Sequence, residues 1–226
     1  MSKHQTKTPI TMSFKFFIQA RMSSKRLPGK VLLPFLGKTV IENIVNTVGK
    51  EHTVVVTSND ETDNILAEKL ISLDIETFRG SLHNVFDRYA NAMIKYQPEW
   101  VIRICADSPV MSKQLLDIIL DYKKFDADLI TNLWPRTFPV GHSIELIKTK
   151  TFLKIDQSDL SLDEKEHVTR HFYQNSEKYR ILNVYQTPDM SHQNLAIDNK
   201  GDIERVEKLS KYEIKYEKSS FFCNYD

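Results

Sequence analysis

Cysteine and net charge are both scarce in this sequence. Two of its 226 residues are cysteines, and 31 Lys and Arg residues nearly balance 30 Asp and Glu residues, leaving a formal charge of +1. Cys105 and Cys223 lie far apart, without the closely spaced Cys and His residues of a structural zinc site, so we interpret both as reduced thiols of a cytoplasmic protein. The lack of excess positive charge argues against a nucleic-acid-binding protein.

A long apolar run is absent as well. No segment approaches the roughly 20 apolar residues that cross a bilayer, and the first residues, MSKHQTKTPITM, lack the apolar core of a signal peptide. We therefore expect no membrane span. We interpret residues 1–12 as a flexible N-terminal tail and residues 13–226 as a single domain, because this length suits one substantial α/β domain.

Short apolar runs alternate with segments of helical period along most of the chain. This alternation predicts an α/β fold with a mostly parallel central sheet flanked by helices. The expected strands are Lys15–Gln19, Thr53–Ser58, Ile75–Phe78, Trp100–Cys105, Asp128–Thr131, Ser143–Ile147, Ile181–Val184 and Leu195–Ile197. The expected helices are Val40–Val48, Glu61–Ile71 with Ile65, Leu66 and Leu70 on its apolar face, a stripe from Val85 to Tyr96, and Leu115–Leu120. Ser112 and Ser161 are expected helix N-caps.

One short segment concentrates positive charge directly after the first expected strand. The string QARMSSKRLPGK, residues 19–30, contains the cations Arg21, Lys25, Arg26 and Lys30. Ligands of open α/β sheets bind beyond the carboxyl ends of the strands, and cations placed there suit phosphate oxygens. The segment has neither the Walker spacing GxxxxGK[ST] nor the dinucleotide pattern GxGxxG. A solvated basic loop therefore remains the alternative to a phosphate site.

Two aspartates are expected at the same edge of the sheet. Asp107 follows the VIRIC strand, and Asp198 follows the NLAI run. Each alone is typical of a turn or a helix cap. Together they suit a hard divalent cation such as Mg²⁺, which prefers oxygen ligands and often binds one or two carboxylates plus substrate phosphates. With the cationic loop, they predict a site for Mg²⁺ and a nucleoside triphosphate.

Ordered motifs along the chain resemble a known family. They are FFIQARMSSKRLPGKVL, VVVTSND, FRGSLHNVFDRY, VIRICADSP, RTFPVGHSIEL, EHVTRHF and NLAIDNKGDIERV, running from about Lys15 to about Leu209. These motifs resemble the cytidylyltransferase-like proteins of surface and spore-coat polysaccharide biosynthesis, and more distantly the 3-deoxy-manno-octulosonate and N-acylneuraminate cytidylyltransferases. The resemblance implies a single Rossmann-like nucleotidyltransferase domain of the nucleotide-diphospho-sugar transferase type. It implies Mg²⁺-dependent transfer of CMP from CTP to an acidic sugar or related acceptor, with release of pyrophosphate, by a homodimer.

The same resemblance implies roles for individual residues. Arg21 and Lys30 would be the catalytic cations. The nucleotide-binding residues would be Ala20, Arg21, Lys30, Arg79, Gly80, Ser81 and Asp87. The acceptor-binding residues would be Arg103, Arg136, His142, Glu145 and His167, and the metal ligands Asp107 and Asp198. Ser143 stands near a position where the family commonly has an aspartate, so the acceptor's identity stays open.

Two other functions remain to be weighed against this one. A metal-dependent glycosyltransferase would use a nucleotide sugar on a related fold, but the sequence has no Asp-x-Asp pair after the central strand. A non-catalytic nucleotide-binding regulator would keep the fold without turnover. The sequence does not distinguish CTP from another pyrimidine triphosphate.

Overall fold

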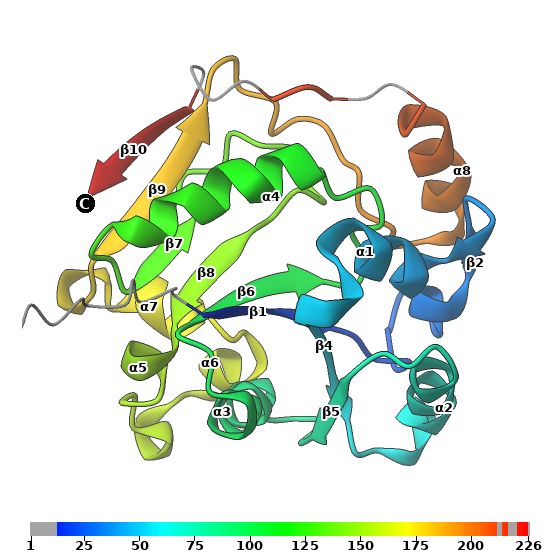
Figure 1. Cartoon of the computed structure of the whole chain (residues 1–226), viewed down its shortest axis with the longest axis horizontal. Coiled ribbons are helices and arrows are strands. Elements are labelled where there is room, and N and C mark those ends of the chain that lie inside the picture. Colours follow the sequence, from blue (N-terminus) through cyan, green and yellow to red (C-terminus); the bar gives the residue numbers. More distant parts are fainter. Residues whose placement is uncertain (1–12, 212–213, 217–220, 226) are drawn as a thin grey trace, which may run out of the picture.

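An eight-stranded sheet forms the centre of the molecule (Figure 1). The computed structural model describes residues 13–211, 214–216 and 221–225. The expected tail, residues 1–12, lies outside the described residues, and the boundary at residue 13 stays a prediction. In spatial order the strands are β10 (Phe221–Tyr225), β9 (Ile181–Gln186), β7 (Leu129–Thr131), β8 (Glu145–Lys148), β6 (Trp100–Cys105), β1 (Phe14–Gln19), β4 (Thr53–Ser58) and β5 (Thr77–Gly80).

The sheet is mostly parallel, as the sequence predicts. Strand β1 lies between β4 and β6 and is parallel to both, and β5 and β9 are parallel to their partners β4 and β7. Strand β8 is antiparallel to both β6 and β7, and β10 is antiparallel to β9. A separate two-stranded sheet joins β2 (Pro34–Phe35) to β3 (Lys38–Thr39). The prediction of a single α/β domain is confirmed.

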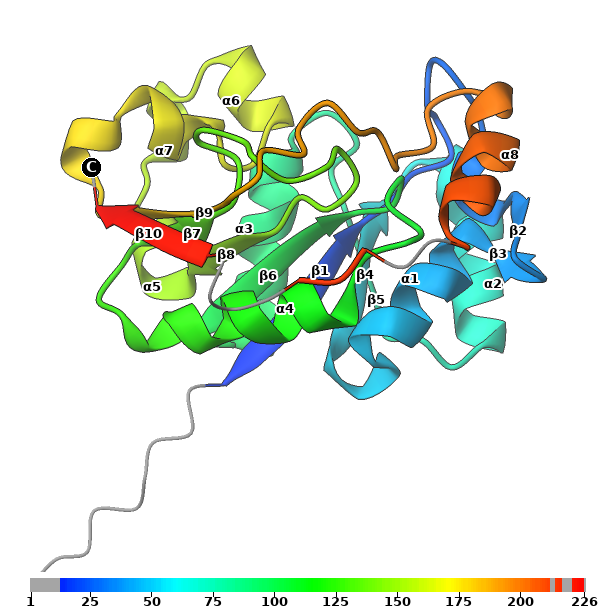
Figure 2. The same ribbon diagram turned by 90° about the horizontal axis from the view of Figure 1, so that it is seen from above.

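Helices cover both faces of the sheet. The α-helices are α1 (Val40–Val48), α2 (Asn64–Ser72), α3 (Val85–Tyr96), α4 (Lys113–Leu120), α5 (Thr149–Phe152), α6 (Leu162–Glu166), α7 (Arg170–Gln174) and α8 (Lys200–Leu209). The 3-10 helices are η1 (Lys30–Leu32), η2 (Lys50–His52), η3 (Glu61–Asp63), η4 (Asp121–Lys124), η5 (Gln157–Asp159) and η6 (Ser176–Lys178). Figure 2 shows α1 and α4 on one side of the sheet and α3, α6 and α7 on the other.

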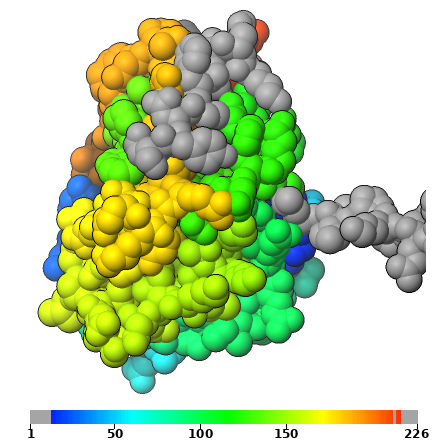
Figure 3. All heavy atoms as spheres, turned by 90° about the vertical axis from the view of Figure 1, so that its left-hand side faces the viewer, coloured from blue at the N-terminus to red at the C-terminus, as the bar shows by residue number. Residues whose placement is uncertain are grey.

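Alternation along β1 divides the core into two layers, because successive side chains of a strand point to opposite faces. Phe16 and Ile18 pack in a cluster with residues of α1 and α4, whereas Phe17 packs with residues of α3, α5 and α7. The segment that carries α5, α6 and α7 is prominent on the face seen in Figure 3. Buried apolar side chains on both faces thus hold the carboxyl edge of the sheet rigid beneath the loops.

Capping residues explain where several helices begin. The Thr39 hydroxyl accepts the Glu42 N–H at the start of α1, and the Ser161 hydroxyl accepts the Glu164 N–H at the start of α6, each in a complete capping box. The Ser112 hydroxyl accepts the Leu115 N–H at 3.3 Å. The predicted N-caps Ser112 and Ser161 are confirmed.

Four sequence predictions are wrong. Leu195–Ile197 is buried but is not a strand; its backbone N–H groups donate to loops, for example from Ile197 to the Asp107 carbonyl at 2.8 Å. Strand β5 begins at Thr77 rather than at Ile75, and β8 begins at Glu145 rather than at Ser143. Ile65 is 57% exposed instead of lying on the apolar face of its helix, and α2 begins at Asn64, after η3, rather than at Glu61.

Within the described residues, no helix combines the length and apolar character that crossing a bilayer requires.

Candidate active site

A cationic loop begins where β1 ends. Residues 20–30, which we call the cationic loop, pass the carboxyl ends of β4 and β6 and reach α8 (Figure 2). The N–H of Gly29 donates to the Met22 carbonyl at 2.8 Å and closes the loop. Gly29 has a φ of 71°, in the left-handed region that favours glycine. A tight backbone path therefore sets the cations' spacing.

Asp63 anchors the start of this loop. Its Oδ1 accepts the Met22 N–H at 2.7 Å, and its Oδ2 accepts the Thr57 hydroxyl at 2.9 Å and the Ser58 N–H at 3.0 Å. The Asp63 side chain is fully buried. Sequence reasoning missed this residue, because a carboxylate before a helix is typical of a cap and only the folded chain brings Met22 to it.

Lys30 lies between the two predicted metal ligands. Its Nζ is 3.4 Å from Asp107 Oδ2 and 3.2 Å from Asp198 Oδ1, and it donates to the Ile197 carbonyl at 2.8 Å. Arg26 Nη2 also donates to Asp198 Oδ1, at 2.8 Å. The structure thus brings Lys30, Asp107 and Asp198 together, although they are far apart in the sequence.

Asp202 positions Asp198. At the start of α8, Asp202 Oδ2 accepts the N–H groups of Asp198 and Asn199 at 2.8 and 2.9 Å. Arg205 Nη2 donates to Asp202 Oδ1 at 2.8 Å and to the Ala196 carbonyl at 3.0 Å. The segment before α8 is therefore fixed from both sides, and the Asp198 carboxylate faces Lys30 from a rigid backbone.

The other predicted nucleotide residues flank the loop. Ala20 is buried, and its N–H donates to the Val56 carbonyl at 3.3 Å. Arg21, at the loop's start, has Nη2 3.5 Å from Glu166 Oε1, and about a third of its side chain is exposed. This weak surface pair leaves the Arg21 guanidinium accessible to an anion.

Arg79 instead braces the loop after β4. Its Nε donates to the Ser58 carbonyl at 2.8 Å, and its Nη2 donates to the Asp60 carbonyl at 3.0 Å and to Asn64 Oδ1 at 2.8 Å. The guanidinium is committed to the protein, so Arg79 here shapes the site rather than pointing a free cation into it.

The segment after β5 rests on a buried arginine, whose burial sequence reasoning did not foresee. Arg88 is fully buried, and its Nη1 donates to the Ser81 carbonyl at 2.7 Å, while its Nε and Nη2 have no hydrogen-bond partner among the described residues. Burial lowers the Arg88 pKa. A Cβ on Gly80 would lie 2.8 Å from Arg88 Cγ, so glycine is required there. Asp87, beside Arg88, accepts from Asn91 at 2.9 Å.

Two of the predicted acceptor residues form a buried ion pair. Arg103 Nη1 donates to Glu145 Oε2 at 2.5 Å, and the Tyr173 hydroxyl donates to Glu145 Oε1 at 2.6 Å. Arg103 also donates to Gln19 Oε1, at 3.2 and 3.1 Å. Both Glu145 oxygens are committed to protein donors, so this cluster forms the floor beneath the end of β1.

Arg136 is half-buried beside this cluster. Its Nη2 donates to the Ser143 hydroxyl at 3.0 Å and its Nη1 to the Pro139 carbonyl at 3.4 Å, both uncharged acceptors. Burial lowers the pKa of Arg136, and the charge of Glu145 opposes that shift. Because its direct partners are neutral, Arg136 keeps a positive charge available for an anionic group.

The rings of the two histidines contact residues outside the cluster that the other predicted acceptor residues form. His142 is buried, with Nε2 2.9 Å from the Val110 carbonyl and Nδ1 2.5 Å from the Tyr216 hydroxyl. His167 is largely exposed, 3.6 Å from Asp163. The structure therefore groups Arg103, Arg136 and Glu145 but not the histidines.

A family model described as "Cytidylyltransferase" matches residues 16–224. The chain belongs to the cytidylyltransferase family. It is 30% identical over 208 residues to the spore coat polysaccharide biosynthesis protein SpsF of Bacillus subtilis, covering 86% of this chain and 85% of that protein. The family and these relatives make it a nucleotidyltransferase, as the motifs predict.

Solved structures agree with this assignment. A cytidylyltransferase from Leptospira borgpetersenii is 29% identical, with a TM-score of 0.83 over 90% of this chain and 89% of that one. A CMP:2-keto-3-deoxy-manno-octonic acid synthetase in complex with CTP is 15% identical, with a TM-score of 0.64 over 89% of this chain and 100% of that one. The second likeness shows a shared fold.

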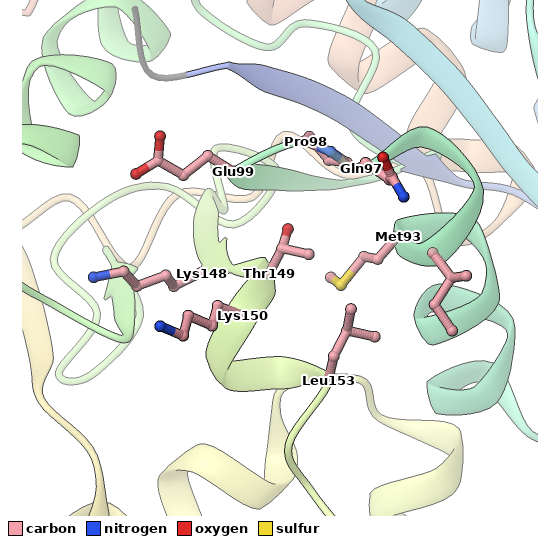
Figure 4. Close-up of a pocket in the computed structure, with 9 residues that line it drawn as sticks. Met93, Gln97, Pro98, Glu99, Lys148, Thr149, Lys150 and Leu153 are labelled. Atoms are coloured by element: carbon pink, nitrogen blue, oxygen red, sulfur yellow. The ribbon is translucent and has the colours of Figure 1, made fainter. Parts of the chain in front are cut away.

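Among the cavities on the described part of this cytidylyltransferase, two differ in their distance from the carboxylate pair. One, of about 1350 Å³, is lined by residues of α1, α4 and α8 and by residues 109–114 and 190–195, which follow Asp107 and precede Asp198. The other, of about 400 Å³, lies at the opposite edge of the sheet, where β6 begins; Met93, Thr149 and Leu153 point toward one another there, whereas Lys148 and Lys150 extend away (Figure 4). The first is lined by residues from both chain segments that carry the carboxylate pair, and the second is not.

Protonation of His142 is expected to destabilise this cytidylyltransferase in acid. Burial lowers the His142 pKa from 6.5 to about 4, so the folded state favours the neutral ring. This stabilisation is complete above pH 6.5 and is lost as the pH falls toward 4, which amounts to about 2–3 kcal/mol between pH 7 and pH 4.5. Urea unfolding at both pH values measures the free energy of unfolding. Its drop from pH 7 to pH 4.5 should be smaller by that amount in His142→Asn than in the wild type. Equal drops in the two proteins would contradict the assignment.

Proposed function

We propose that this cytidylyltransferase transfers CMP from CTP to an acidic sugar or related small acceptor, with release of pyrophosphate, for surface polysaccharide biosynthesis. One observation supports it above the others: the cationic loop, Asp107 and Asp198 converge at the carboxyl edge of the sheet through Lys30. The names of SpsF and of the CTP-bound synthetase support the nucleotide and the pathway.

The donor set at the edge of the sheet fits a divalent cation. Asp107, Asp198 and the Ile197 carbonyl all place an oxygen within 3.4 Å of the Lys30 ammonium, so these oxygens already surround a positive charge. Two carboxylates with substrate phosphates completing the ligands are typical of Mg²⁺. Asp107 and Asp198 would hold this ion, which when bound neutralises charge that accumulates on the phosphates.

The chain's own residues orient the reactants. Arg21 and Lys30 bind phosphate oxygens, and their charge stabilises the transition state as negative charge shifts toward the leaving group. An acceptor oxygen forms a bond to the α-phosphorus in line, the bond between that phosphorus and the bridging oxygen of pyrophosphate breaks, and the acceptor's proton passes to solvent. Positioning supplies most of the acceleration.

An acidic acceptor suits the other half of the site. Arg136 is half-buried and bonded to two neutral oxygens, so a ligand carboxylate or phosphate would find a partly desolvated cation. Ser143, near a position where the family commonly has an aspartate, gives the Arg136 guanidinium a neutral partner. Arg103 and Glu145 support this region from beneath, and the proposal keeps His142 and His167 as weaker candidates. We further propose a homodimer acting in the cytoplasm, by resemblance to related cytidylyltransferases.

The direct test is pyrophosphate release. The protein is incubated with Mg²⁺, a panel of acidic sugars and phosphorylated small molecules, and either one nucleoside triphosphate or one nucleotide sugar. We expect acceptor-dependent release with CTP alone. Consumption of a nucleotide sugar instead would identify a glycosyltransferase, and CTP binding without turnover across the panel would identify a regulator. Size-exclusion chromatography with light scattering tests the dimer.

A further inference from the structure

Lys30 is proposed to bind phosphate, yet its ammonium contacts the oxygens that are proposed to bind the divalent cation. Its ammonium is enclosed by three oxygens, those of Asp107, Asp198 and the Ile197 carbonyl, and its side chain is only 13% exposed. Lys30 thus lies where the divalent cation of the proposed function would bind. An ammonium and a metal ion cannot share the same three oxygens, because two cations at that spacing repel strongly in a partly buried site.

Charge in this cluster is balanced without any ligand. Asp107 and Asp198 carry two negative charges, and the cations in contact with them, Lys30 and Arg26, carry two positive charges. Arg26 is the more exposed of the pair, at 71% against 13% for Lys30. One divalent cation would replace both contacts charge for charge, and two cations on the loop would then be released toward the phosphates.

We propose that Lys30, assisted by Arg26, is a resident counter-cation of the metal site. In the nucleotide-free protein Lys30 holds Asp107 and Asp198 together and competes with divalent cations. With a divalent cation and the triphosphate bound, Lys30 would pass from the carboxylates to phosphate oxygens, and the three oxygens that it now contacts would be left to hold the divalent cation. The inference rests on the proposed function for the second half of this exchange only.

Because Lys30 exchanges between carboxylates and phosphates, replacing it should strengthen metal binding and weaken phosphate binding. Removing the Lys30 charge frees the carboxylates for a metal, so Lys30→Met should bind Mn²⁺ about tenfold more tightly than the wild type, within the usual range of coupling between sites. The same change removes the cation that passes to the phosphates once the metal is bound, so affinity for pyrophosphate at saturating Mn²⁺ should fall about tenfold. A residue that merely braced the fold would weaken both.

Mn²⁺ binding is measured by electron paramagnetic resonance without nucleotide, and pyrophosphate binding by calorimetry at saturating Mn²⁺. Lys25→Met removes an exposed cation from the same loop and is the matched control, with no expected change in Mn²⁺ affinity. Asp107→Asn should abolish the gain seen in Lys30→Met when the two are combined. If Lys30→Met does not fold, Arg26→Met tests the same competition, with a smaller gain because Arg26 is exposed.

Equal or weaker Mn²⁺ binding by Lys30→Met, with its thermal unfolding unchanged, would overturn the proposal, as would Mn²⁺ binding that Asp107→Asn leaves intact. Because the metal assay contains no nucleotide, its outcome is separate from that of the CTP assay. A gain in Mn²⁺ affinity in a protein that does not use CTP would keep the counter-cation and reject the proposed substrate.

Discussion

Replacing Asp107 by asparagine is expected to lower kcat for pyrophosphate release by about 10²–10³-fold, comparable to losing one preorganised charge-stabilising group at a reacting phosphate. Asp107 Oδ2 is 3.4 Å from the Lys30 ammonium, and its Oδ1 accepts the Ser108 hydroxyl at 3.0 Å. An asparagine side chain keeps one oxygen and the volume but loses the negative charge that the divalent cation requires. Steady-state kinetics at saturating CTP measure the loss.

The fold should survive this change, because 30% of the Asp107 side chain is exposed and the exchange is isosteric. Asp117→Asn on α4 is the matched control, since Asp117 is exposed and pairs with Lys113 on the surface. It should retain wild-type kcat. Activity of Asp107→Asn within a factor of about three of the control would remove Asp107 from the proposed metal site.

Replacing Glu145 by alanine is expected to lower the free energy of unfolding by about 3–5 kcal/mol, because the Arg103 guanidinium would remain buried without its counter-charge. Glu145 is 1% exposed and bonds Arg103 and Tyr173. Urea unfolding followed by circular dichroism measures the change. This effect on stability should exceed that of any change on the exposed surface.

A double variant separates the loss of the ion pair from the loss of buried side-chain volume. Removing Arg103 as well, in Arg103→Met/Glu145→Leu, replaces the pair by apolar groups and should recover most of the lost stability, since apolar replacements of buried ion pairs are often neutral or stabilising. A double variant less stable than Glu145→Ala would show that the charge pair is not what the single substitution disrupts.

Strands of the central sheet were predictable where a buried run also pairs with a neighbouring strand. The boundaries of β4 and β6 match the prediction, because each has a short core of β-branched or aromatic residues that the sheet buries on both faces. Leu195–Ile197 has the same apolar character, yet its backbone donors go to Asp107 and Val140 rather than to a neighbouring strand. Burial is visible in a sequence, whereas the hydrogen-bond partner of a backbone group is not.

The site was predictable in its residue types and less so in its contacts. Lys30, Asp107 and Asp198 belong to recognisable motifs, and Asp107 follows strand β6 as predicted. The run before Asp198 is not a strand, so Asp198 reaches the same edge through a loop, whose Ile197 N–H donates to the Asp107 carbonyl at 2.8 Å. The sequence did not reveal that Arg79 is committed to Ser58 and Asn64, or that Arg88 lies buried beneath Ser81. A cation's partner depends on where its long side chain ends, which only the packed structure fixes.

Calorimetric titration of the protein with CTP and, separately, with cytidine tests most directly whether the cationic loop holds a triphosphate. The wild-type protein with Mg²⁺ should bind CTP far more tightly than cytidine or the other triphosphates, and Arg21→Met should weaken CTP about tenfold, the typical cost of one charge-assisted hydrogen bond, with cytidine unaffected. Binding of CTP no tighter than that of cytidine, or CTP affinity unchanged in Arg21→Met, would contradict the triphosphate site.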